Sequence, residues 1–380
     1  MRTKLLLSLA SLTVLTACSI WNANDAEKPF PLPQITQSNQ SLSVVWQQNI
    51  GDPLSEEVGQ SILATVNTDV IAASDNGSVT RINSQSGNIL WQTKVKKIRL
   101  GAAASDKYVA LVNAKNQLII LNANDGQQLW TANLDTSIQS APFIAENVVI
   151  LRTASNKLIA FNLDTQKLIW QYERVSQGLL LHSKRNSMIS PKKGFILAGF
   201  HNAKIVLLDI NTGAQKWEQT LSYSKGFTES ERINDIVSSP AIYAETACTA
   251  SYQGKIGCFD LNNGEMSWEV PFSTSQNLVN DSFGIYAVNT SGQISSFDYA
   301  GNIKWQQKDL TNRKIKDGIL IDNTLVFNDF KGYLHLIDKN SGGLVGQFKL
   351  DDNSVPMIKI GSLIVLHTNS GKIYGLKINK

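Results

Sequence analysis

The most regular feature of the chain is a short segment of alternating apolar and polar residues, followed by a turn and a tryptophan. The first complete copy runs from Gly77 to Asn83, continues with the turn residues Ser86 and Gly87, and ends at Trp91. Alternation with a period of two is typical of a half-buried β-strand, because successive side chains point to opposite faces of a sheet. Glycine supplies the positive φ that a hairpin turn requires. The pattern therefore predicts two antiparallel strands joined by a tight turn.

This unit recurs along the chain at intervals of about 40 residues. The position after the turn is a tryptophan in seven of eight copies, at Trp46, Trp91, Trp130, Trp170, Trp217, Trp268 and Trp305, and is Gly346 in the remaining copy. A repeat of this length with four short strands is typical of a propeller blade. The eight positions predict an all-β, eight-bladed β-propeller, with each tryptophan on an outer strand against the next blade.

The two ends of the repeat array predict how the ring closes. Trp46 follows Leu42 without the first half of a unit before it, whereas Gly371 opens a unit that stops at Lys380. An N-terminal strand that completes the last blade would close the ring and remove its open sheet edges. We therefore expect one domain at residues 42–380, although the length alone would allow two or three.

The first seventeen residues have the composition of an export signal. Arg2 and Lys4 precede an apolar run that is too short to cross a bilayer as a helix. The run ends in Leu-Thr-Ala-Cys at residues 15–18, which resembles the bacterial lipobox. The resemblance implies a signal peptide at 1–17, lipidation of Cys18 and, because Ser19 follows, anchoring in the outer membrane facing the periplasm. Residues 18–41, rich in proline and polar residues, are expected to be the tether. A plain signal peptide is the alternative.

Composition narrows the classes of function. The chain is 42% hydrophobic and 17% charged, so it can build a core and is not disordered throughout. The 35 Lys and Arg residues are scattered among 31 Asp and Glu residues, which excludes a basic patch for nucleic acid. Three cysteines exclude a disulfide-dense scaffold. Cys248 and Cys258 flank a predicted hairpin tip, where they either form a disulfide across adjacent strands or remain buried thiols.

Motifs that carry catalysis are missing from the sequence. The four histidines, His182, His201, His335 and His367, lack metal-ligand spacing. The chain has no Gly-x-Ser-x-Gly, Gly-x-x-x-x-Gly-Lys-[Ser/Thr] or His-Glu-x-x-His motif. Repeat turns account for nearly every Asp. We therefore expect no enzymatic activity, no cofactor and no metal site.

Two repeats are longer than the others and predict a functional surface. Their extra residues fall at about 171–193 and 218–240, in neighbouring blades, and loops on a rigid scaffold are where propellers carry function. The first segment contains three consecutive leucines at 179–181, which cannot all face one side of a strand. At least one is expected at the surface beside cations, as in a protein-binding site. The alternative is a buried inner strand of the fourth blade.

The repeat resembles that of a known family. The form Gly-x-Ile/Leu-x-x-Leu/Phe-Asp-x-x-x-Gly-x-x-x-Trp is similar to the repeat of pyrroloquinoline-quinone enzymes and of the BamB family, lipoproteins of the outer-membrane β-barrel assembly machinery. The large quinone dehydrogenases carry adjacent cysteines over their cofactor, whereas Cys248 and Cys258 are ten residues apart. The lipobox, the tether, the eight repeats and the closing strand together favour the BamB family.

The BamB resemblance implies a function, partners and contact residues. Proteins of that family bind a periplasmic POTRA domain of BamA, the barrel subunit, and help outer-membrane proteins to fold and insert. The family pattern Leu-x-Leu-Arg maps to residues 179–182, with His in place of Arg, and the first Asp of Asp-x-Asp maps to Asp235, with Val237 in place of the second. The expected partner contacts are Leu179, Leu180, Leu181, His182 and Asp235.

Further expected partners are the rest of the assembly complex and unfolded outer-membrane protein precursors, which could add a strand to a blade edge. Two other functions remain as alternatives. One is a pyrroloquinoline-quinone-dependent oxidoreductase, and the other is a periplasmic propeller that binds a ligand in its central channel.

Overall fold

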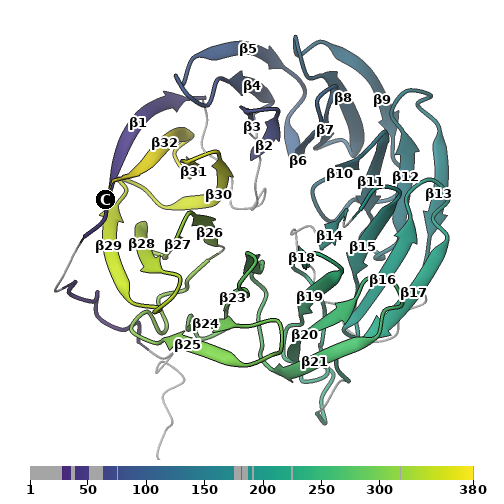
Figure 1. The fold of residues 1–380 in the computed structure, drawn as a ribbon. Helices are drawn as coiled ribbons and strands as arrows, with labels where there is room; N and C mark the ends of the chain where they lie inside the picture. Colours follow the sequence, from purple (N-terminus) through teal and green to yellow (C-terminus); the bar gives the residue numbers. More distant parts are fainter. Residues whose placement is uncertain are drawn as a thin grey trace, which may run out of the picture.

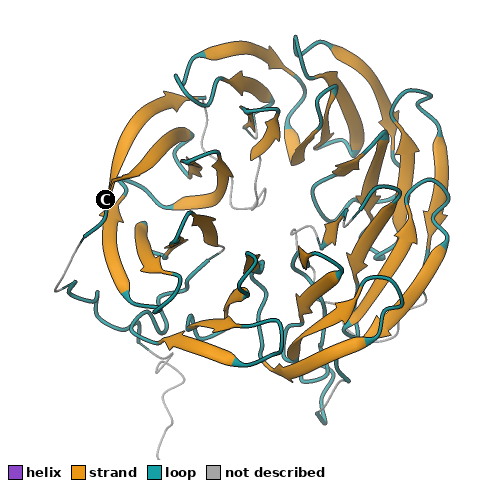
Figure 2. Cartoon of the chain, in the orientation of Figure 1, coloured by secondary structure: helices purple, strands orange, loops and turns teal. Residues whose placement is uncertain are grey.

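The computed structural model describes residues 28–35, 39–50, 63–74, 76–174, 181, 187–190, 192–223, 226–316 and 318–379. In this part of the chain every regular element is a β-strand, and the strands form eight four-stranded antiparallel sheets. The sheets stand around a central axis as the blades of a closed ring (Figure 1; Figure 2). The predicted eight-bladed β-propeller is therefore confirmed. The described residues contain no helix that is long and apolar enough to cross a bilayer.

Blades 1 to 7 are each built from four consecutive strands, with the inner strand at the axis and the outer strand at the rim (Figure 1). Blade 1 contains β2 (Leu63–Val66), β3 (Asp69–Ala73), β4 (Ser78–Ile82) and β5 (Ile89–Lys94). Blade 2 contains β6 (Ile98–Ala104), β7 (Tyr108–Asn113), β8 (Gln117–Asn122) and β9 (Gln128–Asn133). Blade 3 contains β10 (Phe143–Ala145), β11 (Val148–Arg152), β12 (Leu158–Asn162) and β13 (Leu168–Tyr172). Blade 4 contains β14 (Met188–Ile189), β15 (Phe195–Gly199), β16 (Lys204–Asp209) and β17 (Gln215–Thr220).

The second half of the ring repeats this order. Blade 5 contains β18 (Ala241–Tyr243), β19 (Thr246–Ala250), β20 (Lys255–Asp260) and β21 (Met266–Pro271). Blade 6 contains β22 (Val279–Asn280), β23 (Ile285–Val288), β24 (Ile294–Phe297) and β25 (Ile303–Gln307). Blade 7 contains β26 (Gly318–Ile321), β27 (Thr324–Asn328), β28 (Tyr333–Asp338) and β29 (Leu344–Lys349). Blade 8 contains β30 (Ser354–Ile360), β31 (Leu363–Thr368) and β32 (Lys372–Asn379).

The outer strand of blade 8 comes from the other end of the sequence. It is β1 (Ser41–Asn49), which pairs antiparallel with β32, so that Leu42 lies opposite Ile378 and Gln48 lies opposite Ile373. This pairing confirms the predicted closure of the ring by the N-terminal strand. It also means that blade 8 has no hairpin turn between its third and fourth strands, because the two strands come from opposite ends of the chain.

The tryptophans join each blade to the next one. The turn between the third and fourth strands of a blade is called its outer turn here, and the indole of each tryptophan lies against the outer turn of the following blade. The indole N–H donates to a turn carbonyl at 2.6 to 3.2 Å: Trp46 to Ser84, Trp91 to Ala123, Trp130 to Leu163, Trp170 to Ile210, Trp217 to Leu261, Trp268 to Tyr299 and Trp305 to Lys339. The predicted packing against the next blade is therefore confirmed.

Glycine in the outer turn is required by this contact as well as by the turn. Gly213 has a φ of +69°, and a Cβ built on it would lie 2.7 Å from the indole of Trp170. A glycine stands at this place in six of the seven outer turns, and only Gln166 in blade 3 adopts the same left-handed conformation with a side chain, at a φ of 61°. The glycine and the tryptophan thus form one contact, although they come from different repeats.

Gly346 is the exception among the tryptophan positions, and the ring closure explains it. It lies on β29 of blade 7, whose neighbour, blade 8, has no outer turn to receive an indole. The N-terminal segment crosses there instead, and a Cβ on Gly346 would lie 2.4 Å from the carbonyl oxygen of Gln40. Glycine therefore makes room for the chain that leads into the closing strand.

The core lies between neighbouring blades. The second strands are almost wholly buried, as in β11 and β31, and their apolar side chains pack against those of the adjacent sheet. Ile150 of blade 3, for example, belongs to the same buried cluster as Val206 of blade 4. Burial of such a side chain contributes roughly 1.5–3 kcal/mol, so the ring is stabilised by eight interfaces rather than by one central core.

The two cysteines of blade 5 form a disulfide. Cys248 on β19 lies directly opposite Cys258 on β20, with their Cα atoms 4.0 Å apart. Of the two states that the sequence left open, the structure thus contains the cross-strand bridge. The third cysteine, Cys18, and the predicted signal peptide lie outside the described residues.

Replacing Trp170 by Ala should lower the free energy of unfolding by ~3–5 kcal/mol, because a buried indole and its bond to the next blade are lost. Leu168 on the same strand is 44% exposed and provides the control, since Leu168→Ala should change that free energy by less than ~1 kcal/mol. Denaturant unfolding followed by circular dichroism measures both variants. Equal losses would contradict the role given to the indole.

A buried histidine should make stability depend on pH. His367 on β31 is fully buried, and neither ring nitrogen has a hydrogen-bond partner among the described residues. Desolvation lowers its pKa from 6.5 to about 4, so the folded protein keeps it neutral. Below ~6.5 the unfolded chain gains a proton that the folded chain does not bind, and stability falls as the pH drops toward that lower pKa.

In His367→Leu, the loss of unfolding free energy between about pH 7 and about pH 5 should be smaller than in the parent by ~1–2 kcal/mol. Chemical denaturation at the two pH values measures this difference. The same loss in both proteins would show that His367 is not the group responsible.

Candidate partner-binding site

Two long connections form one face of the propeller. The first joins β13 to β14 and spans residues 173–187, and the second joins β17 to β18 and spans residues 221–240. Both link the outer strand of one blade to the inner strand of the next, so their described residues lie on the same side of the ring, which is called the connection face here. The extra residues thus lie where the repeat lengths predicted them. Because the inner strand of blade 4 begins at Met188, Leu181 lies in the connection before that strand.

Asp235 joins the two long connections. Its Oδ2 accepts a hydrogen bond of 2.7 Å from the Leu181 amide, which belongs to the first connection. Its Oδ1 accepts one of 3.1 Å from the Asn202 amide, at the turn that follows β15. Its own carbonyl accepts a bond of 2.9 Å from the Tyr252 amide in blade 5. The carboxylate is buried, with 3% of the residue exposed, so it holds the surface together from beneath.

The residues beside Asp235 are buried too. The Asn234 amide group donates to the Ser222 carbonyl at 3.0 Å, which ties the end of the second connection to its beginning. Ile236 packs on Gly199, where an added Cβ would lie 2.2 Å from its side chain. Val237 is 6% exposed. This part of the second connection is therefore a packed base, and the exposed part of the connection precedes it.

Two arginines lie close to one aromatic ring at the start of the first connection. The guanidinium of Arg152 lies 4.7 Å from the ring centre of Phe200, and that of Arg174 lies 5.9 Å from it. Arg174 also pairs with Glu218 at 2.9 Å. Arg152 is fully buried, donates to the Gly199 carbonyl at 2.9 Å, and has its pKa lowered to about 9 by desolvation. Both cations are engaged within the scaffold rather than presented to a partner.

The second connection presents two aromatic side chains that the sequence analysis missed. Phe227 is 98% exposed and Tyr223 is 80% exposed. The backbone around Phe227 is held by Glu231, whose carboxylate accepts hydrogen bonds from the amides of Phe227 and Thr228 at 2.8 and 3.1 Å. These bonds, the Thr228 amide first, lower the pKa of Glu231. An isolated aromatic in a run of Ser, Thr and Glu is the sequence signal that could have identified the position.

The structure brings together two of the predicted contact residues. Leu181 is half-buried and its amide is bonded to Asp235, so the two segments that the sequence placed in neighbouring blades do meet. The Asp235 carboxylate is buried beneath the backbone of the first connection and is not exposed at the surface. Leu179, Leu180 and His182 lie outside the described residues.

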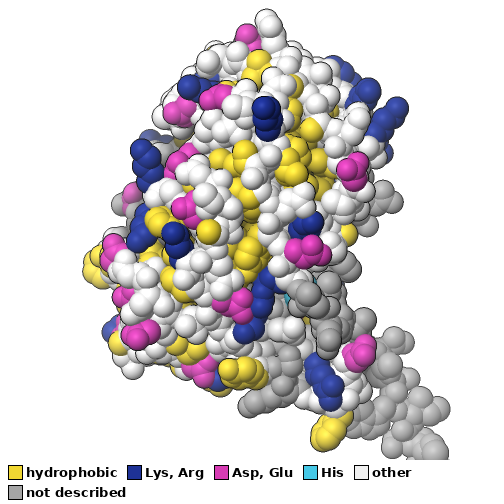
Figure 3. All heavy atoms as spheres, turned by 90° about the vertical axis from the view of Figure 1, so that its right-hand side faces the viewer, with side chains coloured by type: hydrophobic (Ala, Val, Ile, Leu, Met, Phe, Trp, Pro, Cys, Tyr) yellow, Lys and Arg dark blue, Asp and Glu magenta, His cyan; other side chains and the backbone are white. Residues whose placement is uncertain are grey.

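The rim over blades 2 to 4 carries apolar side chains among charged ones, as the view in Figure 3 shows. The exposed apolar residues on the outer strands there include Leu129 on β9 and Leu168 and Ile169 on β13, each between 37% and 46% exposed. They stand next to the tryptophans along the strands, and they are exposed whereas the indoles of Trp130 and Trp170 are buried.

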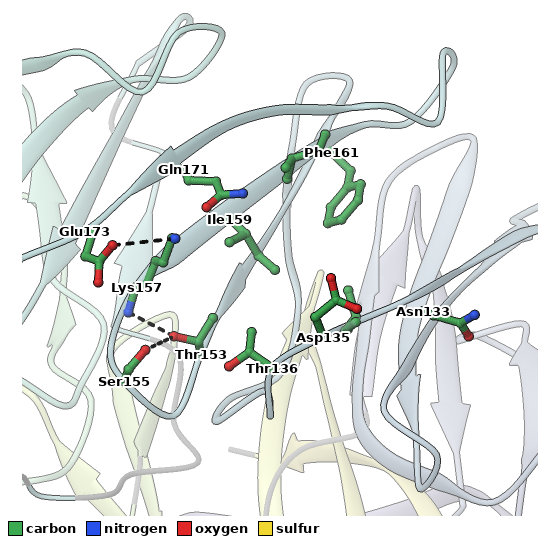
Figure 4. A pocket seen from close by; sticks show the side chains of 12 residues that line it. Asn133, Asp135, Thr136, Thr153, Ser155, Lys157, Ile159, Phe161, Gln171 and Glu173 are labelled. Atoms are coloured by element: carbon green, nitrogen blue, oxygen red, sulfur yellow. Dashed lines mark hydrogen bonds and ion pairs between the residues drawn. The ribbon is translucent and has the colours of Figure 1, made fainter.

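A pocket of about 380 Å³ opens between blades 2 and 3 (Figure 4). Ile159 and Phe161 form its apolar side, and Asp135 enters from the connection that follows β9. At the opposite end, Lys157 pairs with Glu173 at 3.6 Å. Because the lining carries both signs of charge and the cation is already paired, the pocket is not a polarised site for an anionic cofactor. Among the described residues, no three His, Cys, Asp or Glu side chains gather as a metal site.

Comparisons with known proteins agree with the geometry. A family model described as "Outer membrane protein assembly factor BamB" matches residues 75–307. A protein of that name from Burkholderia pseudomallei is 30% identical over 97% of this chain and 96% of its own length. The chain belongs to the BamB family. Another BamB, from Taylorella asinigenitalis, is 29% identical over 100% of this chain and 99% of its own length.

Solved structures share the fold. The crystal structure of BamB from Moraxella catarrhalis matches with a TM-score of 0.80 at 20% identity, over 89% of this chain and 100% of that chain. Quinohemoprotein alcohol dehydrogenase from Comamonas testosteroni matches with a TM-score of 0.68 at 12% identity, over 88% of this chain and 76% of that chain. At these identities the likeness concerns the propeller fold alone, which BamB proteins and quinone enzymes have in common.

Replacing Asp235 by Asn should loosen the first connection, because the amide group of Asn has one oxygen to accept bonds from two amides, Leu181 and Asn202. Hydrogen exchange at the Leu181 amide should become faster, and the free energy of unfolding should fall by ~1–3 kcal/mol. Asp260→Asn is the control, since Asp260 also accepts two amides, in an outer turn on the opposite face. Unchanged exchange at Leu181 in Asp235→Asn would contradict the role of the carboxylate.

Proposed function

We propose that this protein is a non-catalytic scaffold of the outer-membrane protein assembly machinery, and that its connection face binds the periplasmic POTRA region of BamA. Membership of the BamB family over nearly the whole chain supports the assembly role. The observation that carries the binding surface is the hydrogen bond from Leu181 to Asp235, which fixes two long connections from neighbouring blades as one surface. Loops positioned by a rigid scaffold are common sites of binding.

The proposed surface binds through apolar anchors on a rigid base. Leu181 is half-buried, and Phe227 and Tyr223 extend from the second connection into solvent. Large side chains of this kind contribute most of the binding energy in interfaces, because they bury much area for little loss of conformational entropy. Arg232, which donates to the Gly226 carbonyl at 3.1 Å, stands beside them as a polar rim.

The two departures from the family pattern are consistent with an interface that depends on apolar anchors. His182 replaces the Arg of the pattern, so a bidentate guanidinium–carboxylate pair is not available at that position. Val237 replaces the second Asp and is buried against the scaffold. The interface of this protein therefore relies less on charge pairing than the family pattern implies, and more on Leu181 and Phe227.

We further propose that Cys18 is lipidated and holds the propeller at the periplasmic face of the outer membrane. The support is the Leu-Thr-Ala-Cys motif after an apolar run, together with the outer-membrane role in the names of the relatives. Unfolded outer-membrane protein precursors are a second partner in this proposal, because the outer strands at the rim carry free edges beside exposed apolar residues.

Replacing Leu181 or Phe227 by Ala should each reduce capture of BamA's periplasmic region at least tenfold, as expected for an anchor that contributes ~1.4 kcal/mol or more. The measurement is affinity capture of BamA with the full-length variant, solubilised from membranes. Leu90→Ala is the matched control, because Leu90 is 51% exposed at the rim on β5, away from the connection face. Capture that is unaffected by both changes would place the BamA contact elsewhere on the propeller.

A further inference from the structure

Residues 28–35, 39 and 40, called the N-terminal strap here, lie against blades 6 and 7 instead of extending freely from the ring. Figure 1 shows this segment beside β29 and β25, before the chain enters β1. The Phe30 amide donates to the Thr311 carbonyl at 3.1 Å, and the Gln40 amide donates to the Val345 carbonyl at 3.2 Å. The side chain of Gln347 donates to the Pro33 carbonyl at 3.3 Å. Part of the sequence expected to be tether is thus bound to the propeller.

A buried ion pair holds the beginning of the strap. Arg313 donates to the Phe30 carbonyl at 2.9 Å, while its other nitrogens bond to Asp329 at 2.9 and 2.5 Å. The side chains of Arg313 and Asp329 are 4% and 0% exposed. His335 lies 3.2 Å from the same carboxylate oxygen. The guanidinium is therefore held in one orientation, with its remaining donor directed at the strap.

The charge state of this pair is stable. Burial would raise the pKa of Asp329, but hydrogen bonds from His335, the Tyr333 amide and Arg313 outweigh it and lower that pKa to about 2. Asp329 is consequently ionised in any periplasm-like buffer. Separating a buried pair would leave one charge buried without a partner, which is strongly destabilising. Arg313 therefore stays bound to Asp329 and provides a fixed anchor for the strap.

The strap runs from one face of the propeller to the other, and the position of Phe30 determines the face at which the N-terminal chain leaves the ring. Thr311 and Arg313 belong to the connection between β25 and β26, so Phe30 lies at the connection face. Gln40 lies beside Val345, next to the outer turn of blade 7 and thus at the opposite face. The chain toward Cys18 therefore leaves at the same face that carries the two long connections, two blades away along the ring.

Docking of the strap shortens the free tether. Phe30 is twelve residue steps beyond Cys18, and even fully extended these steps reach only about 40 Å. An undocked tether would run from Cys18 to Ser41 and reach about 80 Å. The shorter reach is comparable to the size of the propeller, so the point of exit determines which face stands toward the anchor.

We propose that the N-terminal strap is an orienting interface that turns the connection face toward the lipid surface holding the anchor. This proposal rests on the proposed lipidation of Cys18. It implies that a partner bound to the long connections lies between the propeller and the membrane. Gly346 also contributes to binding of the strap, because any side chain at this position would collide with the carbonyl of Gln40.

Hydrogen exchange on the full-length protein tests the strap independently of the membrane. In Arg313→Ala, the Phe30 amide should exchange about tenfold faster, as expected when the bonds that order it are lost. Gly346→Ala should have the same effect on the Gln40 amide. The controls are Arg81→Ala, which removes an Arg bonded in the same way to Asp69 and to the Ala123 carbonyl, and Gly343→Ala, whose nearest contact is Ser341 at 3.3 Å. Unchanged exchange in both test variants would overturn the strap.

Fluorescence quenching tests the orientation. The full-length lipoprotein is bound to vesicles of phosphatidylethanolamine and phosphatidylglycerol that carry a nitroxide on the headgroup. A dye is attached at Lys115→Cys, on the connection face of blade 2, or at Gln127→Cys, in the outer turn of that blade. The two positions lie at opposite ends of blade 2, about 20 Å apart along the direction of β9.

Quenching should be stronger at position 115 than at position 127, and Arg313→Ala should abolish the difference while Arg81→Ala retains it. Equal quenching at the two positions in the parent would overturn the orientation. Failure of the lipoprotein to bind vesicles would overturn the anchor and the orientation together, and Phe30 protection would still decide the strap. Loss of BamA capture in the Leu181 and Phe227 variants concerns the proposed function alone.

Discussion

The contact between an indole and the outer turn of the next blade is the interaction on which the ring depends. A propeller blade buries its two faces only against its neighbours, so each interface must be filled at the rim as well as near the axis. The indole of Trp170 supplies that volume, and its N–H satisfies a turn carbonyl that would otherwise be buried without a partner. The turn glycine is matched to it, because Gly213 with a side chain would meet the ring. Six of the seven contacts pair an indole with a turn glycine, and Gln166 takes the place of that glycine in the turn that receives Trp130.

Closure of the ring removes this contact at the junction between blades 7 and 8, and this changes both the residue at position 346 and the path of the N-terminal segment. Joining β1 to β32 completes the four strands of blade 8, but it deprives blade 8 of an outer turn and leaves the position of Gly346 without a receptor for an indole. The space is filled by the chain that leads into β1. A topological requirement therefore explains both the missing tryptophan and the presence of a bound segment outside the ring. The bound segment is also held where blades 6 and 7 meet, because Arg313 pairs with Asp329 and donates to the Phe30 carbonyl.

The sequence predicts what repeats and leaves open what does not. Eight blades, the outer-strand tryptophans, the closing strand and the places of the long connections all follow from periodicity, because each copy confirms the others. Asp235 could be matched to a family pattern, but its burial beneath the Leu181 amide could not, since an Asp in a loop gives no sign of which amides it will meet. The Arg313 to Phe30 bond joins residues 283 positions apart, and no periodic signal links them. The cysteine pair required the register of two strands, which places Cys248 opposite Cys258.

The departures from the repeat are where this propeller differs from a purely structural ring. A blade of minimal length offers only short turns and strand edges, and its outer turn is already used by the contact with the neighbouring blade. The end of the added chain between β17 and β18 forms a buried base, in which Asp235, Asn234 and Ile236 bond to or pack on the neighbouring turns and strands. Support from beneath holds the backbone that carries the outward side chains, which lowers the ordering cost of the binding proposed for this surface. Phe227 is thus exposed on a connection whose end, from Asn234 onward, is buried against the scaffold.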